Sequence, residues 1–598
     1  MKASDYIAKR LAEAGVTSAY GYTGGAITHT VDSLGNLGIR FINFNHEQGA
    51  IFAASGASKA DNRIRVLLAT SGPGATNLLT GIAEAYFDSV PLLIITGQVN
   101  TYDFKWDKKC RQIGFQETDI VSIAKPITKY ATLVSDPKMV VEELEKCIQI
   151  ALSDRPGPVV LDIPMDVQRA EIDAPKHPHA QETHKKPELS RALLEEIAAL
   201  IADAKRPLML VGNGCKIADA KEELVRVAHA LDVPVVVSLL GKGCFPEDDA
   251  LFLGFIGSYG QRHANIALAH ADVILVTGAR LDSRQTGNKL GIFKGKRIIQ
   301  VDIDPDEIGV KLDIVKPVPV DARQFLVEFH TLLRTKSSTT KHTAWRAMLR
   351  ELQQRFTPFS ELERAQANPF HYEVMQEISN RLAPDDIVCV DIGQVQMVAA
   401  QIFEMRAEQK FITSGGLAPM GYALPAAIGV ALETGKRAIS INGDGGMQIN
   451  IQELNLIAKK RLPVVTFVFD NKALGMIKQF QDLYFGGRYY GTDESHEYYS
   501  CDFAQIAQAY GIPSITIHNG DTDWKEKIDG AMRSREPILV HLVLDYDTKV
   551  YPKLRFDRTL DNPEPELSKD EDAFIKKRLD ATPSTSKMSS TDTPYYDG

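Results

Sequence analysis

The sequence predicts an α/β protein built from three doubly wound domains, each with a parallel sheet. Short runs rich in Val, Ile and Leu alternate with helical patterns along three long segments. In the first segment the strand-like runs include 66–70, 91–99 and 157–164, and the pattern "MVVEELEKCIQIALS" between the last two is helical. This alternation is typical of parallel βαβ units.

The other two segments repeat the pattern, and two polar stretches separate the three. The middle segment contains "RPLMLVGNG", "DVPVVVSLLGKG", "ADVILVTGAR" and "KRIIQVDIDP", and the last contains "DDIVCVDIG", "KRAISINGDGG", "LPVVTFVFDN" and "EPILVHLVLDY". Domains of roughly 150 to 190 residues are a usual size. The boundaries that we expect are domains at 1–173, 191–333 and 366–550, linkers at 174–190 and 334–365, and a C-terminal extension at 551–598 whose end, 581–598, is disordered.

Composition excludes several classes of protein. With 44% hydrophobic and 24% charged residues, the chain has the make-up of a soluble globular protein. A net charge of −9 argues against a general nucleic-acid or membrane-surface binder. Six scattered cysteines without a CxxC pair favour a reducing cytoplasm over a disulfide framework or zinc site. The start reads as an amphipathic helix rather than a signal peptide, and no apolar run is long enough to span a membrane.

An aspartate in a glycine turn and an asparagine past the next strand stand out in the last segment. Asp444 is flanked by Gly443, Gly445 and Gly446, and Asn471 ends the run "LPVVTFVFDN". In a doubly wound sheet, ligands collect at the carboxyl ends of strands, so the two side chains are expected to meet there. Carboxylate and amide oxygens suit Mg²⁺, and the glycines and the following helix start suit a phosphate. The alternative is two unrelated turns, for which Gly-Asp-Gly and Asp-Asn are common chemistry.

This pairing resembles the signature of thiamin-diphosphate (ThDP) enzymes, a GDG followed about two dozen residues later by an Asn-containing pair. The family usually has Asn-Asn, and here the first of the pair is Asp470. The resemblance implies that Asp444, Asn471 and the carbonyl of Ala473 hold Mg²⁺, which the cofactor diphosphate bridges. It also implies that Glu47 in "HEQGA" is the catalytic carboxylate that bonds N1′ of the aminopyrimidine.

Motifs along residues 1 to 550 resemble the acetolactate synthase (acetohydroxyacid synthase large-subunit-like) branch of that family. They include "GYTGGAITH", "LLATSGPGATNLLTGIAEAYFDSVPLLIITGQV", "FQETDIV", "GARLDSRQTGN", "VDIDPDEIG", "DIGQVQM" and "GGLAPMGYALPAAIG". The resemblance implies a pyrimidine-binding, a central and a diphosphate-binding domain. It implies a homodimer or homotetramer, because Glu47 acts on the cofactor held by the partner chain.

The resemblance also implies further cofactor contacts. Met420 matches the buttress that bends ThDP, and the central domain of this branch carries FAD in a structural role. The additional ThDP contacts are Gly393, Gln394 and Met476, and the expected FAD contacts are Gly212, Gly214, Gly278, Arg280, Asp302 and Ile303.

The implied reaction is decarboxylation of pyruvate and transfer of the hydroxyethyl (acetyl-anion) unit to a 2-keto acid. Arg284 matches the arginine that binds the acceptor carboxylate, a task suited to its planar fork. Phe480, Ser258 and Met165 stand where the branch has tryptophan, methionine and lysine, which predicts a roomier and more polar pocket wall. The substrate contacts that we expect are Gly25, Phe115, Gln116, Ser258, Arg284 and Phe480.

Two other acceptors remain open at this stage. A nucleotide-linked deoxysugar could receive the same unit at its keto group, which Ser258 and Phe480 favour. Simple decarboxylation with release of aldehyde is the third possibility. The sequence does not decide whether a regulatory subunit binds.

Overall fold

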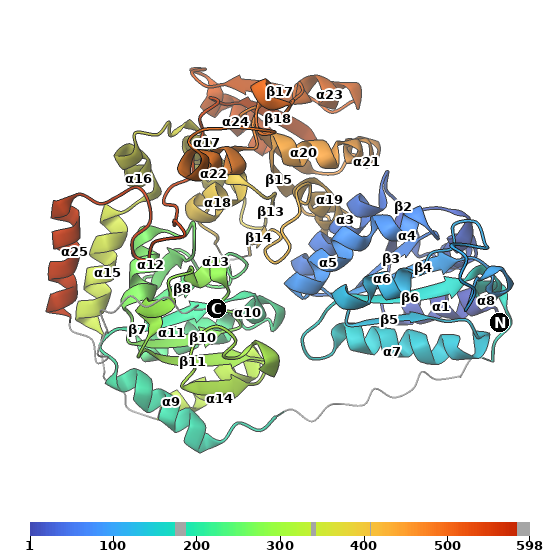
Figure 1. Cartoon of the computed structure of the whole chain (residues 1–598), viewed down its shortest axis with the longest axis horizontal. Coiled ribbons are helices and arrows are strands. Elements are labelled where there is room, and N and C mark those ends of the chain that lie inside the picture. Colours follow the sequence, from blue (N-terminus) through green and yellow to red (C-terminus); the bar gives the residue numbers. More distant parts are fainter. Residues whose placement is uncertain (174–186, 336–341, 407, 583–598) are drawn as a thin grey trace.

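The computed structural model describes residues 1–173, 187–335, 342–406 and 408–582. Three six-stranded sheets follow one another along the chain, and every strand pair within them is parallel. Figure 1 shows them as the blue, green and yellow-to-red parts of the molecule, each with helices packed on it. This confirms the predicted α/β class. Among the described helices, none combines the length and apolarity that a membrane span requires.

The first sheet has the order β2-β1-β3-β4-β6-β5. Its strands are β1 (Ser18–Tyr22), β2 (Arg40–Asn43), β3 (Arg65–Ala69), β4 (Leu92–Gln98), β5 (Tyr130–Leu133) and β6 (Val159–Pro164). Its helices are α1 (Ala3–Glu13), α2 (Thr28–Asn36), α3 (Glu47–Asp61), α4 (Pro73–Asn77), α5 (Leu79–Asp88), α6 (Ile120–Ala124), α7 (Val140–Leu152) and α8 (Met165–Arg169). Strands β3, β4 and β6 are buried along their whole length, which explains their continuous apolar sequences.

The second sheet has the order β12-β11-β10-β7-β8-β9. Its strands are β7 (Pro207–Val211), β8 (Val235–Val237), β9 (Phe252–Phe255), β10 (Val273–Thr277), β11 (Arg297–Asp302) and β12 (Lys316–Pro319). Its helices are α9 (Arg191–Asp203), α10 (Asn213–Ile217), α11 (Lys221–Leu231), α12 (Arg262–His270), α13 (Ser283–Thr286) and α14 (Ala322–Thr335). This is the strand order of dinucleotide-binding folds, with the switch point between β7 and β10.

The third sheet repeats the order of the first, as β14-β13-β15-β16-β18-β17. Its strands are β13 (Ile387–Val390), β14 (Lys410–Ile412), β15 (Ala438–Gly443), β16 (Val464–Asp470), β17 (Ser514–His518) and β18 (Ile538–Val543). Its helices are α17 (Phe370–Asn380), α18 (Gln394–Ile402), α19 (Ala423–Thr434), α20 (Asp444–Ile449), α21 (Leu454–Lys460), α22 (Gly475–Phe485), α23 (Phe503–Ala509) and α24 (Trp524–Arg533). The switch point lies between β13 and β15.

Helices α3 and α19 pack directly against each other and join the first and third sheet domains. A Cβ at Gly56 would lie 2.6 Å from the Cα of Ala426, and one at Gly429 would lie 1.9 Å from the carbonyl oxygen of Ala53. Glycine is therefore required at both crossing points, because any side chain would push the two helices apart.

The range 334–365, predicted as a linker, differs from that expectation because it is largely helical. It contains α15 (Thr343–Arg355) and α16 (Pro358–Ala365). Residues 336–341 of this range lie outside the described residues. The indole of Trp345 is fully buried and donates a hydrogen bond to the carbonyl oxygen of Pro207, 3.0 Å away. The apolar residues of α15 recur at helical spacing from Trp345 onward, just past the polar stretch that suggested a linker. The first predicted linker, 174–190, lies outside the described residues up to 186.

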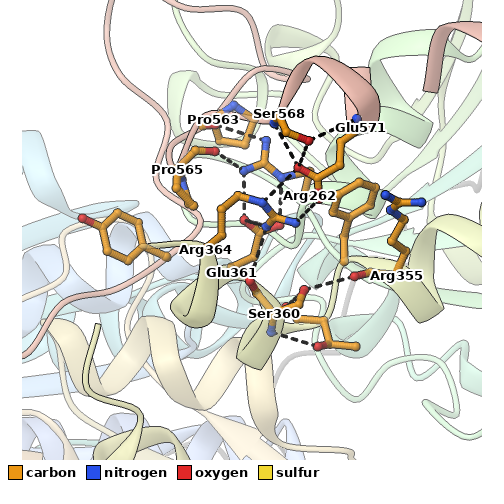
Figure 2. A network of polar contacts seen from close by, with 12 residues as sticks. Arg262, Arg355, Ser360, Glu361, Arg364, Pro563, Pro565, Ser568 and Glu571 are labelled. Atoms are coloured by element: carbon orange, nitrogen blue, oxygen red, sulfur yellow. Dashed lines mark hydrogen bonds and ion pairs between the residues drawn. The ribbon is translucent and has the colours of Figure 1, made fainter. Parts of the chain in front are cut away.

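The C-terminal extension returns to the central domain and ends in α25 (Lys569–Ala581). Figure 1 shows α25 beside α15 at the edge of the molecule. Arg262, at the start of α12, donates to the carbonyl oxygens of Pro563 and Pro565 at 3.2 and 2.6 Å (Figure 2). Arg364 pairs with Glu571 of α25 at 2.6 Å. Of the predicted disordered end, 581–598, the first two residues complete the described chain and 583–598 lie outside it.

Candidate active site

The carboxyl ends of β15 and β16 bring the two predicted metal ligands to one edge of the third sheet. Asp444 begins α20 directly after β15, and Asn471 follows β16. Both are buried, at 4% and 6% exposure, and both line a cavity of about 570 Å³, here called the C-terminal cavity. The oxygen Oδ2 of Asp444 is buried without a hydrogen-bond partner among the described residues. An orphaned carboxylate oxygen facing a cavity is the feature that a bound cation would satisfy.

Neighbouring side chains orient Asn471. Its amide nitrogen donates to Thr548 Oγ1 at 2.6 Å and to Gln394 Oε1 at 3.3 Å. These bonds leave the amide oxygen as the group available to a cation. Ala473, whose carbonyl was predicted as the third ligand, also lines the cavity. Two side-chain oxygens and one carbonyl oxygen form a ligand set that suits Mg²⁺. Phosphate and water would fill the remaining coordination positions of the ion.

Two carboxylates lie close together at this edge of the sheet, and their pKa values are shifted in opposite directions. Burial, together with the neighbouring Asp470 carboxylate, raises the pKa of Asp444 to about 8. Burial alone would also raise the pKa of Asp470, but a hydrogen bond from His541 at 2.9 Å helps to hold it below its ordinary value. Asp470, which replaces the usual asparagine, is thus engaged by His541 of β18 and by the hydroxyl of Ser500. Asn471 is the member of the pair that lines the cavity.

Gly446, which follows the GDG turn, is sterically required, and the atom that it would meet belongs to a residue that the sequence reasoning missed. A Cβ at Gly446 would lie 2.2 Å from Oδ2 of Asp391, and one at Gly445 would lie 2.9 Å from Cε of Met420. Gly443 has no neighbour within 4 Å of such an atom. Buried Asp391 accepts hydrogen bonds from the backbone nitrogens of residues 392, 421 and 422. It therefore fixes the β13 turn and the Met420 loop relative to each other, and its place at the end of β13 in "DIGQVQM" was the available signal.

The remaining predicted ThDP contacts gather in the same cavity. Gly393 has a φ of +108°, which favours glycine, and Gln394 begins α18. Gln394 donates to the carbonyl oxygen of Thr548 at 2.8 Å. Met420 and Met476 also line the cavity.

The predicted acceptor residues of the central and third domains also line this cavity, and the part of the wall that they form is here called the acceptor end. Ser258, Arg284 and Phe480 are all part of its wall. The hydroxyl of Ser258 donates to the carbonyl oxygen of Arg284 at 3.3 Å, so it is partly engaged. Phe480 packs against the rings of Tyr484 and Phe556, with centroids 4.8 and 5.9 Å away. The C-terminal extension thus contributes an aromatic wall that fills space beside Phe480.

Glu47 and the predicted substrate residues of the first domain gather around the loop between β3 and α4. Glu47 begins α3, is 5% exposed and accepts a hydrogen bond from Asn77 at 3.0 Å. A Cβ at Gly74 of α4 would lie 3.2 Å from Oε1 of Glu47, and one at Gly72 of the loop would lie 2.8 Å from the Cβ of Gln116. Phe115 is 84% exposed.

This cluster and the C-terminal cavity are separate within one chain. Glu47, Gly25, Phe115 and Gln116 are not among the described residues that line the C-terminal cavity. Gly25 is exposed, with no atom within 4 Å of a Cβ placed there. Of the first-domain residues, Gly25 and Phe115 are exposed, Gln116 is half-buried and Glu47 is buried, while the predicted metal and acceptor residues line the cavity.

A second cavity, of about 550 Å³ and here called the central cavity, lies at the switch point of the second sheet. Five of the six predicted FAD contacts line this cavity. The sixth, Gly212, directly precedes α10 at the same edge of the sheet. A Cβ at Gly212 would lie 2.1 Å from the carbonyl oxygen of Gly278, which itself has a φ of +61°. The two turns approach so closely that only glycine fits, as a dinucleotide cradle requires. At the end of β11, burial raises the pKa of Asp302 to about 6.

Three parallel-sheet domains with one cavity in the central domain and one beside the third sheet form the architecture of a thiamin-dependent enzyme. Comparison with known proteins supports this assignment. Models of thiamine pyrophosphate enzyme domains match the N-terminal TPP binding domain at 1–123, the central domain at 194–329 and the C-terminal TPP binding domain at 391–542.

Curated relatives show which branch of the thiamine pyrophosphate enzymes the chain resembles. A probable acetolactate synthase large subunit of Methanocaldococcus jannaschii is 38% identical over 556 residues, covering 91% of this chain and 92% of that protein. The large subunit of Corynebacterium glutamicum is 35% identical, covering 92% and 88%. The isozyme 3 large subunit of Escherichia coli is 33% identical, covering 92% and 96%. The chain belongs to the acetolactate synthase large-subunit family of thiamine pyrophosphate enzymes.

Proposed function

We propose that the chain catalyses the ThDP- and Mg²⁺-dependent decarboxylation of pyruvate and transfers the two-carbon unit to a 2-keto acid, as acetolactate synthases do. One observation carries this proposal. The metal-binding residues Asp444 and Asn471 and the acceptor residues Arg284 and Phe480 line a single cavity. A cofactor anchored at one end of it would present its reactive part to an acceptor held at the other end.

The chain's own residues divide the work. Asp444, Asn471 and the carbonyl of Ala473 would hold Mg²⁺ and, through it, the diphosphate. Bound ThDP supplies a nucleophilic carbon that adds to the 2-keto acid and accepts the electron pair released on loss of CO₂. Met420, whose Cε lies beside Gly445, would support the bound cofactor. Arg284 would bind the acceptor carboxylate, and its guanidinium forms no hydrogen bond or ion pair with any described residue.

Glu47 would act from a second copy of the chain, holding a proton at N1′ of the aminopyrimidine. Within one chain Glu47 faces the β3–α4 loop rather than the C-terminal cavity. We therefore propose a homodimer, or a homotetramer built from such dimers, with two shared active sites.

We also propose that the central cavity binds FAD in a structural role. The close approach of Gly212 and Gly278 at the switch point supports this assignment. Ser258, Tyr259 and Arg284 line both cavities, so a bound flavin would help to shape the acceptor wall.

Product analysis tests the proposed reaction. The protein is supplied with ThDP, Mg²⁺ and FAD and incubated with pyruvate alone, then with 2-ketobutyrate or a nucleotide-linked keto-deoxysugar. Formation of acetolactate from pyruvate alone is expected. Acetaldehyde as the sole product would indicate a simple decarboxylase, and transfer only to the sugar would indicate the nucleotide-sugar reaction. Either result would overturn the proposal.

A further inference from the structure

A lysine of the C-terminal extension, Lys553, reaches the acceptor end of the C-terminal cavity. It lines the cavity, and its side chain is buried, with 4% exposure. Its Nζ lies 5.8 Å from the ring centroids of both Tyr259 and Phe480. No described residue gives this amine a hydrogen bond or an ion pair. The carboxylates of Glu564 and Asp482 attract this ammonium from beyond ion-pair distance. A buried ammonium that forms no hydrogen bond or ion pair is costly and calls for an anionic partner.

The backbone of the extension fixes where this lysine lies. The nitrogen of Lys553 donates to the carbonyl oxygen of Glu564 at 2.9 Å, and the reverse bond is 2.8 Å. The next residue, Leu554, donates to the carbonyl oxygen of Ser258 at 2.7 Å. Arg262 holds the chain further on through Pro563 and Pro565 (Figure 2). Lys553 is therefore built into the cavity wall rather than displayed on a free tail.

The charges that line the cavity do not balance at the acceptor end. Arg555 is compensated by Glu564 at 3.0 Å, and burial lowers the pKa of His371 to about 4, so that it is neutral near pH 7. Asp444 belongs to the metal end. Among the described residues, neither the exposed guanidinium of Arg284 nor the buried amine of Lys553 forms an ion pair, although the carboxylates of Glu564 and Asp482 attract the amine at longer range. Burial lowers the pKa of Lys553 to about 8, which still leaves it mostly protonated near pH 7.

We propose that Lys553 is an acceptor-binding residue, and that the preferred acceptor is a 2-keto acid carrying a second anionic group, carboxylate or phosphoryl, on its side chain. The proposal rests on the carboligase function proposed above. The planar fork of Arg284 takes the carboxylate beside the keto group, as a bidentate pair. Lys553 takes the second anion as a point charge at the aromatic wall. An acceptor with an uncharged side chain would leave the amine buried and unpaired.

Acceptor kinetics test this with matched substrates. Pyruvate is the donor, and the acceptors are 2-oxoglutarate, 2-oxopentanoate of the same chain length, and phosphonopyruvate for the phosphoryl arm. The wild type is expected to have a kcat/KM for a dianionic acceptor at least tenfold above that for 2-oxopentanoate. Lys553→Met is expected to lower this ratio at least tenfold, mainly through KM, and Lys553→Arg to restore most of it. The dianionic acceptor whose kcat/KM falls more in Lys553→Met identifies the group that Lys553 recognises, carboxylate for 2-oxoglutarate and phosphoryl for phosphonopyruvate.

The control variant is Lys549→Met. Lys549 lies four residues earlier, pairs with Asp547 and Asp482, and is not part of the cavity wall. The Lys549→Met substitution removes the same charge from the same segment, so the ratio of the kcat/KM values for the two acceptors should stay unchanged. A ratio near one in the wild type, or an equal loss for both acceptors in Lys553→Met, would overturn the proposal.

Calorimetric titration gives a readout that does not require turnover. Protein loaded with ThDP and Mg²⁺ is titrated with 2-oxoglutarate or 2-oxopentanoate in the absence of pyruvate. Tighter binding of 2-oxoglutarate, lost at least tenfold in Lys553→Met, is expected. If pyruvate yields no carboligation product at all, the proposed function fails, and this titration still decides the role of Lys553. Equal affinities in the wild type and Lys553→Met would refute it.

Discussion

The carboxylate of Glu361 receives two hydrogen bonds from the guanidinium of Arg262, with N–O distances of 2.8 and 2.9 Å, and both side chains are buried. The same guanidinium binds two carbonyl oxygens of the C-terminal extension (Figure 2). One buried pair thus ties α12, α16 and the extension that carries Lys553 to one another.

Replacing Glu361 with Ala should destabilise the central region. The change leaves a fully buried guanidinium without its carboxylate, which typically costs about 3–5 kcal/mol. Urea unfolding followed by circular dichroism measures the loss. Glu222→Ala is the control, because its pair with Arg226 is exposed at 78% and 55% and should matter by less than about 1 kcal/mol. Equal shifts in the two variants would contradict the assignment.

Removing the carboxylate of Asp444 should abolish metal-dependent cofactor binding. Asp444→Ala takes away one of the two side-chain oxygens available to Mg²⁺. We expect the affinity for ThDP in the presence of Mg²⁺ to fall at least about 100-fold, the upper end of what outer-shell changes produce. Equilibrium dialysis with and without Mg²⁺ measures it. A Mg²⁺-dependent affinity that survives the change would place the metal elsewhere.

Glu47→Gln should separate cofactor binding from catalysis. The amide keeps the size of the side chain but cannot hold the proton as a carboxylate does. Pyruvate consumption should fall about 10²- to 10⁴-fold, while ThDP binding is retained. Glu142→Gln, on the exposed side of α7, is the matched control. Unchanged pyruvate consumption in Glu47→Gln would remove the catalytic role.

Gly278→Ala should prevent flavin binding. The added methyl would lie 2.7 Å from the Cα of Gly214 at a backbone φ of +61°. The purified variant is expected to lose the flavin absorbance near 450 nm. Gly291→Ala in the same domain is the control, because nothing lies within 4 Å of a methyl group there. A wild type that takes up no flavin when FAD is added would contradict the assignment.

A buried acid away from the site predicts a pH dependence of stability. Burial raises the pKa of Asp162 from its ordinary 3.8 to about 7, despite hydrogen bonds from Thr96 and Gln98. The folded state therefore holds this proton more tightly than the unfolded state. Its contribution is fully present below the unfolded pKa and is lost as pH rises through about 7.

Asp162→Asn should accordingly flatten the loss of stability between pH 5 and pH 8. At about 1.4 kcal/mol per unit of pKa shift, the difference between wild type and variant across this range should be roughly 2 kcal/mol. Thermal unfolding at several pH values measures it. A wild type and variant with parallel pH profiles would show that Asp162 titrates normally.

Much of the candidate site could be predicted from local sequence patterns. Asp444 and Asn471 could be paired from sequence because one crossover helix between parallel strands brings their ends to the same edge. The α15 helix was missed because the polar stretch 334–345 masked its beginning at Thr343. Lys553 was missed because no local pattern marks it, and its position depends on a chain segment that returns to the central domain.

The sequence by itself determined the three α/β domains, the glycine turns and the pairing of Asp444 with Asn471, because these follow from short-range periodicity and strand-end chemistry. Only the tertiary structure decided which walls meet in each cavity. It placed Asp391 against Gly446, Phe556 against Phe480 and Lys553 beside Tyr259, contacts between residues far apart in the chain. Such contacts arise from how whole domains and the extension pack, and no local pattern records them.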